Sequence, residues 1–133
     1  MAKTELQKEL EIMNMPASEA ALRILHIYIL MDTSISMKKI MDKINEAMQP
    51  IIDAISSEAE GHPNAQVKIH LITFSTGAAM VTPEDGVPVK NYIWQNLDPY
   101  GITDLGCAFE ILSGQLRPEV FGMRNLPPVI LLV

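Results

Sequence analysis

The chain has 133 residues, enough for one domain built around a single hydrophobic core. Hydrophobic residues make up 48% and charged residues 20%, a balance typical of a folded protein and too apolar for a disordered one. The net charge of -6 argues against binding to nucleic acid or to an anionic membrane surface, because both need clustered Lys and Arg.

Compartment signals are few. The longest apolar run, residues 24–31, contains His26 and is too short to span a bilayer. The first ten residues are charged throughout and do not resemble a secretory signal. The single cysteine, Cys107, cannot form an internal disulfide. These features together predict a cytoplasmic location.

Two elements are predicted before residue 33. Residues 4–13 predict a short amphipathic helix that ends at Pro16, so residues 1–16 are assigned to an N-terminal helical extension. Residues 25–32 are apolar with almost no alternation, which is typical of a strand buried on both faces in a parallel sheet.

A long helix is predicted after the turn at residues 32–36. Its apolar side chains recur at three- and four-residue spacing: Ile40, Ile44, Met48, Ile51, Ile55 and Ala59. Pro50 is expected to kink this helix or to split it in two, because proline removes a backbone donor and crowds the preceding turn.

Residues 66–75 predict a second strand, and residues 78–82 predict a short third strand antiparallel to it. A polar turn region follows at residues 83–88. The segment from 91 to 100 is less regular, and its apolar residues are placed on a helical turn: Ile93, Trp94 and Leu97.

A second long helix is predicted at residues 103–116, with an apolar face of Leu105, Ala108, Phe109, Leu112 and Leu116. Residues 127–133 predict a last buried strand. The order β-α-β-β-α-β predicts an α/β protein with a doubly wound, mostly parallel open sheet.

Ligands of open α/β sheets bind beyond the carboxyl ends of the strands, where the strand order reverses. Two segments rich in hydroxyls and small residues are predicted at this end. Residues 32–36 leave the first strand, and residues 100–106 lead into the second long helix.

These segments resemble the metal-ion-dependent adhesion site of von Willebrand factor A domains. Asp32-x-Ser34-x-Ser36 resembles the first element of that site. Gly101-Ile-Thr103-Asp-Leu-Gly106-Cys-Ala108 is similar to the second, Gly-x-Thr-x-x-Gly-x-Ala. Residues 128–133 resemble the strand that precedes the third element, an Asp. The resemblance covers about residues 24–133 and is closest to bacterial intracellular A domains of the tellurium-resistance-associated kind.

The resemblance implies a Rossmann-like fold in which residues 17–133 form a partial A domain without its last two strands and final helix. It implies Mg²⁺, or Mn²⁺ or Ca²⁺, bound by the hydroxyls of Ser34, Ser36 and Thr103. Asp32 would hold a coordinated water or contact the ion directly. The implied function is a non-enzymatic protein-interaction module, in which a partner's carboxylate completes the coordination of the metal.

The chemistry of the residues agrees with this resemblance. Mg²⁺ prefers oxygen ligands and keeps several waters, so a few hydroxyls and one carboxylate suit it. Gly101 and Gly106 are expected to let the second loop approach closely.

Two features depart from the family pattern. Ile35 stands where the family has Gly, so the first loop is expected to be stiffer or shifted. The chain also ends at Val133, before the third element's Asp, so we expect weak metal affinity. The edge at residues 129–133 predicts self-association.

Other interpretations stay open. Asp32 or Ser34 alone can cap the following helix, and Asp104 is interpreted as a first-turn helix charge. The Asp32-Thr-Ser triplet also resembles aspartic proteases of the dimeric retroviral type. Those enzymes share one proton between two carboxylates, but their fold is nearly all strand. A degenerate A domain with a purely structural role in assembly is a third possibility.

The remaining candidate groups predict no further site. The histidines show no ligand spacing, with His26 and His70 interpreted as strand residues and His62 as a loop residue. Cys107 is interpreted as a small packing residue. The chain has no phosphate-binding loop of the Gly-x-x-x-x-Gly-Lys-Ser/Thr kind, so a nucleotide hydrolase is not supported.

Overall fold

The computed structural model describes residues 23–117 and 125–133, arranged as an α/β unit around one mixed sheet. The strands follow the order β3-β2-β1-β5, and β4 also pairs with β2. The predicted helix at residues 4–13 and the first residues assigned to the main domain, 17–22, lie outside the described residues.

The two longest strands are parallel and lie at the centre of the sheet. β1 (Arg23–Asp32) pairs with β2 (Ala65–Ser75) along its whole length, and β5 (Val129–Leu132) pairs in parallel with the other side of β1. β3 (Gly77–Met80) and β4 (Val87–Pro88) are antiparallel to β2. The sheet is therefore mostly parallel, and the predicted antiparallel third strand is confirmed.

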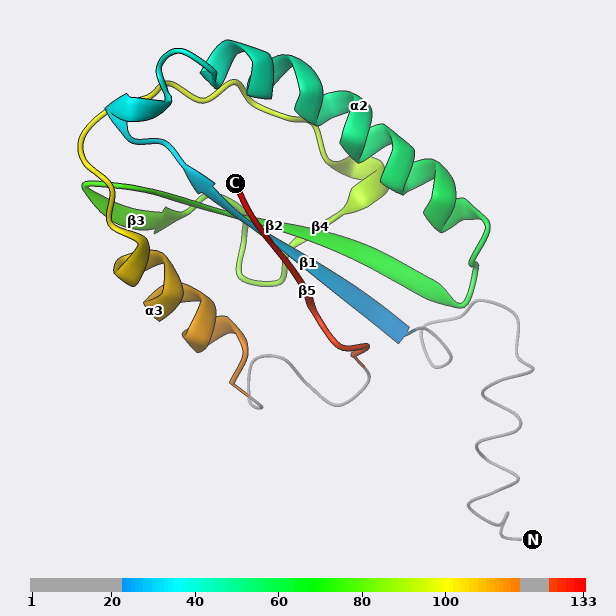
Figure 1. Ribbon diagram of the computed structural model, residues 1–133. Helices are drawn as coiled ribbons and strands as arrows, with labels where there is room; N and C mark the ends of the chain where they lie inside the picture. Colours follow the sequence, from blue (N-terminus) through cyan, green and yellow to red (C-terminus); the bar gives the residue numbers. More distant parts are fainter. Residues whose placement is uncertain (1–22, 118–124) are drawn as a thin grey trace, which may run out of the picture.

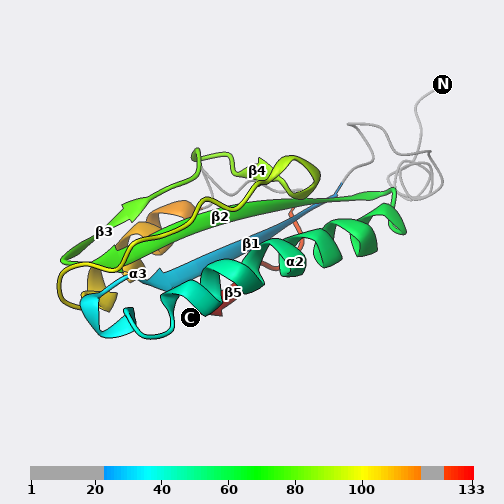
Figure 2. The ribbon, with the colours of Figure 1, turned by 90° about the horizontal axis from the view of Figure 1, so that it is seen from above.

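The two helices cover opposite faces of the sheet, as Figures 1 and 2 show. α2 (Met41–Glu60) packs on one face and α3 (Leu105–Gln115) on the other. Successive side chains of a strand point to opposite faces, so β1 supplies Ile27, Ile29 and Met31 to the α2 side. Its Tyr28 and Leu30 face α3. The doubly wound arrangement explains why β1 is apolar at almost every position.

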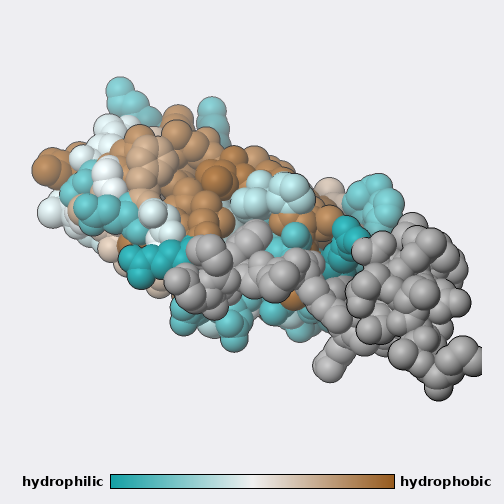
Figure 3. All heavy atoms as spheres, turned by 90° about the horizontal axis from the view of Figure 1, so that it is seen from below, coloured by the Kyte–Doolittle hydropathy of each residue, from teal (hydrophilic) through white to brown (hydrophobic). Residues whose placement is uncertain are grey.

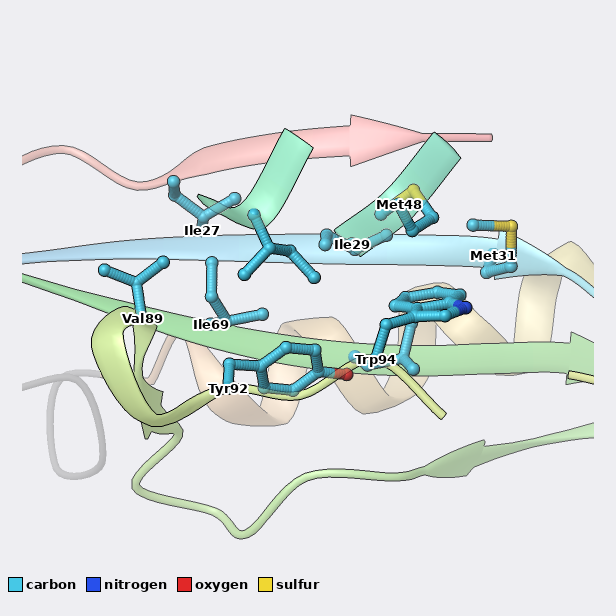
Figure 4. Close-up of a cluster of buried hydrophobic side chains, with 10 residues drawn as sticks. Ile27, Ile29, Met31, Met48, Ile69, Val89, Tyr92 and Trp94 are labelled. Atoms are coloured by element: carbon cyan, nitrogen blue, oxygen red, sulfur yellow. The ribbon is translucent and has the colours of Figure 1, made fainter. Parts of the chain in front are cut away.

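The core on the α2 side contains aromatic residues from a distant segment. Figure 4 shows Tyr92 beside Ile69 of β2 and the ring of Trp94 below Met48 of α2. They follow the short 3-10 helix η2 (Val89–Asn91) and belong to an extended segment, not to the predicted helical turn. Trp94 is 7% exposed whereas the adjacent Ile93 is 71% exposed, which is the alternation of an extended chain.

Pro50 does not split the long helix, because α2 continues through it from Met41 to Glu60. The predicted apolar stripe is rotated slightly. Met41, Met48 and Ile52 are the buried residues of α2, while Ile40 and Ile51 are each 46% exposed. A short 3-10 helix, η1 (Ile35–Met37), precedes α2, and Ile40 lies just before the α-helix begins. This later start explains why Met41 replaces it in the core.

The prediction that the last strand is buried is wrong. All residues of β5 are at least 40% exposed. β1 is the only described strand that pairs with β5, so no described strand lies along its other edge. Phe109 of α3, placed on the predicted apolar face, is also 48% exposed. Figure 3 shows apolar side chains gathered on the side of the molecule where α3 and β5 lie.

Candidate metal site at the carboxyl end of the sheet

The first candidate loop begins where β1 leaves the sheet between its two neighbours. The N–H of Asp32 donates to the carbonyl of Val133 at 3.0 Å, and the N–H of Thr33 donates to the carbonyl of Phe74 at 2.8 Å. The chain passes from β1 to β2 on one side, and β5 lies on the other. The loop therefore starts at the point where the strand order reverses, which is where α/β sheets bind ligands.

Within this loop, three of the predicted ligands lie together. Oδ1 of Asp32 accepts a hydrogen bond of 2.8 Å from the N–H of Ser34. The hydroxyl oxygens of Ser34 and Ser36 are 2.8 Å apart. Ser34 is 1% exposed, whereas Ser36 lies at the surface. The loop presents a partly buried carboxylate and a pair of hydroxyls at one end of the sheet.

The hydrogen bonds of this turn do not support the interpretation of Asp32 or Ser34 as a helix cap. Ser34 occupies the N-cap position of η1, but its side chain makes no capping hydrogen bond. Asp32 instead binds the backbone of the turn, as aspartate commonly does two residues before an N–H group. The long helix α2 begins only at Met41, so neither residue caps it.

The second candidate loop is joined to the first by two backbone hydrogen bonds. The N–H of Tyr100 donates to the carbonyl of Thr33 at 2.8 Å, and the N–H of Ile35 donates to the carbonyl of Gly101 at 2.9 Å. Thr103 follows Gly101 by two residues and is exposed. The structure therefore brings the two loops to one end of the sheet, with Thr103 on the loop that adjoins the two serines.

Two polar residues of α2 hold the segment that delivers this second loop. Oδ1 of Asn45 accepts hydrogen bonds from Nε1 of Trp94 and from the N–H of Leu97, at 3.0 and 2.9 Å. Oε1 of Gln49 accepts from the N–H of Trp94 at 2.7 Å. These bonds replace secondary structure along an irregular segment. The helical pattern alone did not reveal this role for Asn45 or Gln49.

Thr76, in the turn between β2 and β3, is a third contributor that the sequence analysis missed. Its Oγ1 accepts a hydrogen bond of 3.1 Å from the N–H of Ile102. Gly101 has a φ of 71°, and an added Cβ there would collide with Oγ1 of Thr76. Its position could have indicated this role, because Thr76 directly follows Ser75 at the carboxyl end of a strand adjacent to β1.

Gly101, Gly106 and Ile35 were each expected to affect the shape of the two loops. The close approach expected at Gly101 is present, whereas a Cβ added to the exposed Gly106 would lie 3.7 Å from its nearest neighbour. Ile35 does not have a positive φ, and its side chain is 56% exposed. Whether Ile35 makes the first loop stiffer or shifted stays a prediction.

Asp104 and Cys107 form a helix cap beside the second loop. Oδ1 of Asp104 accepts from the N–H of Cys107 at 3.1 Å, and the Cys107 thiol donates to Oδ2 at 3.0 Å. These bonds lower the pKa of Asp104, and the bond to Asp104 raises the pKa of the Cys107 thiol. A raised pKa keeps the thiol protonated, so this cysteine has no nucleophilic activation.

The candidate metal ligands are three hydroxyls and one carboxylate. In residues 23–117 and 125–133, no group of three or more His, Cys, Asp or Glu side chains is placed to hold a metal ion. Adjacent ligands of octahedral Mg²⁺ at its usual bond length are about 2.9 Å apart. The Ser34 and Ser36 hydroxyls are joined by a hydrogen bond of 2.8 Å, a separation that two adjacent ligand positions could also take.

The fold differs from the one the protease interpretation requires. That interpretation needs a nearly all-strand protein, whereas the residues after Asp32 form η1 and then the 20-residue helix α2. None of the described helices is long and apolar enough to cross a membrane.

We compared the sequence with known protein families and with curated proteins. The chain matches no protein-family model and no curated protein.

Proposed function

We propose that this protein is a metal-dependent protein-interaction module with the fold of a von Willebrand factor A domain. Asp32, Ser34, Ser36 and Thr103 would bind Mg²⁺, with Mn²⁺ or Ca²⁺ as alternatives, and the ion would attract a carboxylate from a protein partner. The main support is the pair of hydrogen bonds that joins residues 32–36 to residues 100–103. The single cysteine supports a cytoplasmic location as part of this proposal.

The charge of the site explains why the metal would recruit an acidic partner. Asp32 is the only carboxylate among the four proposed ligands, so a divalent ion bound there keeps a net positive charge. Mg²⁺ also holds part of its shell as water, and a carboxylate oxygen can replace one of these. The same low charge predicts weak affinity for the ion when no partner is present.

The metal is tested by isothermal titration with MgCl₂ and MnCl₂. Asp32→Asn is the sharpest variant, because asparagine can still accept the hydrogen bond from Ser34 but carries no charge. Ser36→Ala removes an exposed hydroxyl. Ser113→Ala, at an exposed serine of α3, is the matched control. We expect binding in the wild type and control and none in the other two.

The outcomes separate the alternatives. Equal heats from wild type and Asp32→Asn would remove Asp32 from the site. A wild-type protein that folds but takes up neither ion would favour the degenerate A domain with a structural role in assembly.

Self-association through β5 is the second part of the proposal. The N–H of Val133 donates to Leu30, and its carbonyl accepts from Asp32, so both groups point toward β1. In a parallel ladder the alternate residues Ile130 and Leu132 then direct their N–H and C=O groups outward. A second β5, running antiparallel about Leu131, would pair with these groups. Both strands are apolar on both faces.

Sedimentation velocity tests this interface. Ile130→Lys places a charge on the exposed edge and should yield monomers, since edge lysines block strand pairing. Ile93→Lys is the matched control, because Ile93 is an exposed isoleucine on another segment. A monomeric wild type at high concentration, or dimers of both variants, would exclude the β5 interface.

A further inference from the structure

The α3-facing side of the sheet contains a buried histidine pair that the candidate metal site does not use. Nδ1 of His26 on β1 and Nε2 of His70 on β2 are 2.7 Å apart. His70 is 1% exposed, and the ring of Tyr28 stacks on it with centroids 4.2 Å apart. His26 precedes Asp32 by six strand positions, which is about 20 Å along the sheet.

The hydrogen-bond partners indicate where the protons lie in the neutral pair. Oδ1 of Asn125 is 3.2 Å from Nε2 of His26 and can only accept, so this nitrogen carries hydrogen. Nδ1 of a neutral His26 is then an acceptor, and Nε2 of His70 donates to it. Nδ1 of His70 is left as a buried lone pair, and it has no hydrogen-bond partner among residues 23–117 and 125–133.

The turn at residues 83–88 lies directly over His70. Gly86 has a φ of 78°, and a Cβ added there would lie 2.7 Å from Nε2 of His70. The N–H of Gly86 closes the turn by donating to the carbonyl of Pro83 at 2.8 Å. Beyond it, only the two residues of β4 pair with β2. Before it, the N–H of Val81 donates to the carbonyl of Leu71 and Oγ1 of Thr82 accepts from the N–H of Leu71, so the ring is covered by a tight turn that is held to β2 at both ends.

The surroundings of His70 favour its neutral form. Burial, followed by the charges of His26 and Lys68, lowers the pKa of His70 to about 4, while Asp85 acts in the opposite direction. Asp85, whose charge favours protonation of the ring, lies on the covering turn itself. A proton added at Nδ1 would create a charged donor without an acceptor inside the closed structure.

We propose that His70 is an acid-sensitive switch, and that protonation of its ring opens the turn at residues 83–88. The opened turn admits water to the ring, whose Nε2 edge lies against Gly86, and allows Asp85 to pair with the charged form. If His26 is protonated too, its Nδ1 can no longer accept the hydrogen bond from His70. Loss of this bond favours the same open state.

Hydrogen–deuterium exchange of peptides covering residues 81–92 tests the switch. A ring with the ordinary histidine pKa in the open turn and a pKa of about 4 in the closed one shifts the opening equilibrium about thirtyfold between about pH 7.5 and pH 5. We expect wild-type exchange in this region, corrected for the intrinsic effect of pH, to rise by this factor.

His70→Phe keeps a ring beneath Gly86 but cannot bind a proton there, so its exchange should not respond to acid. His62→Phe is the matched control, because His62 is exposed beyond α2 and its loss should leave the response intact. Equal corrected exchange at both pH values in wild type, or the same acid response in His70→Phe, would overturn the switch.

A second measurement needs no variant. Nitrogen NMR of wild-type imidazoles should show a bare Nδ1 in His70 at neutral pH. The amide signals of residues 84–87 should change together with protonation of that ring. A His70 ring that becomes protonated while these amides stay unchanged would contradict the proposal even if His70→Phe failed to fold.

Discussion

β1 and β5 have the same kind of sequence but very different surroundings. Both are nearly uninterrupted apolar runs, and Leu30 of β1 is the register partner of Leu132 in β5. Leu30 is fully buried, whereas Leu132 is 57% exposed. An apolar run therefore indicates that a strand can be buried, while the neighbours of the strand decide whether it is.

The difference has a simple structural cause. β1 has a paired strand on each side and a helix on each face, so all of its central side chains lose contact with water. β5 has β1 on one side only. Residues of the same type also differ in their surroundings elsewhere in the molecule, as His70 differs from His62 and Gly101 from Gly106.

The largest expected effect comes from the leucine pair. Leu30→Ala should lower the free energy of unfolding by about 2–5 kcal/mol, because it leaves a cavity in a close-packed core. Leu132→Ala removes a side chain that is more than half exposed and should cost less than about 1 kcal/mol. Urea denaturation followed by circular dichroism measures both. Both are measured at a protein concentration at which the chain is monomeric, and equal losses there would contradict the exposure of Leu132.

The histidine pair should make stability depend on pH. The pKa of His70 is lowered to about 4 in the folded protein, so between pH 6.5 and 4 the unfolded chain binds more protons than the folded one. Protonation of His70 therefore leaves the free energy of unfolding unchanged above pH 6.5. It lowers this free energy as the pH falls, by about 2 kcal/mol at pH 5. Urea denaturation at several pH values measures the loss.

The comparison of variants isolates this contribution. His70→Phe should flatten the dependence between neutral pH and about pH 5, and His62→Phe should preserve it, since His62 is exposed. A slope that persists unchanged in His70→Phe would assign the effect to other groups.

The smallest expected effect separates Gly101 from Gly106. Gly101→Ala should destabilise the protein by about 1–2 kcal/mol, because its φ is positive and the new Cβ meets Thr76. Gly106→Ala should stabilise α3 by up to about 1 kcal/mol, since Gly106 is exposed and lies within the helix. Thermal unfolding measures the two shifts. Shifts of the same sign would show that residues 100–102 can rearrange freely.

Much of the fold was predictable from local patterns. The apolar run of β1, the helical spacing after it and the short antiparallel strand after β2 all correspond to elements of the structure. The two loops of the candidate site were also predicted to meet, because the carboxyl ends of parallel strands lie on one side of a sheet. These inferences needed only periodicity and chain direction.

Other features depend on contacts between distant residues. Trp94 is buried because Asn45 and Gln49 bind its segment, and no spacing rule connects residues 45 and 94. Thr76 supports Gly101 in the same way. His26 and His70 were correctly predicted as strand residues, but their pairing follows from the β1–β2 register, which places Tyr28 opposite His70.

Local order along the chain specified the strands, the helices and the end of the sheet at which the hydroxyl loops gather, since backbone sterics and side-chain periodicity act between near neighbours. Tertiary structure decided the exposure of β5, the anchoring of residues 92–100 and the enclosure of His70. Each depends on which surfaces meet across more than forty residues of sequence, or fail to meet, and the loss of water at such contacts is set by the assembled fold.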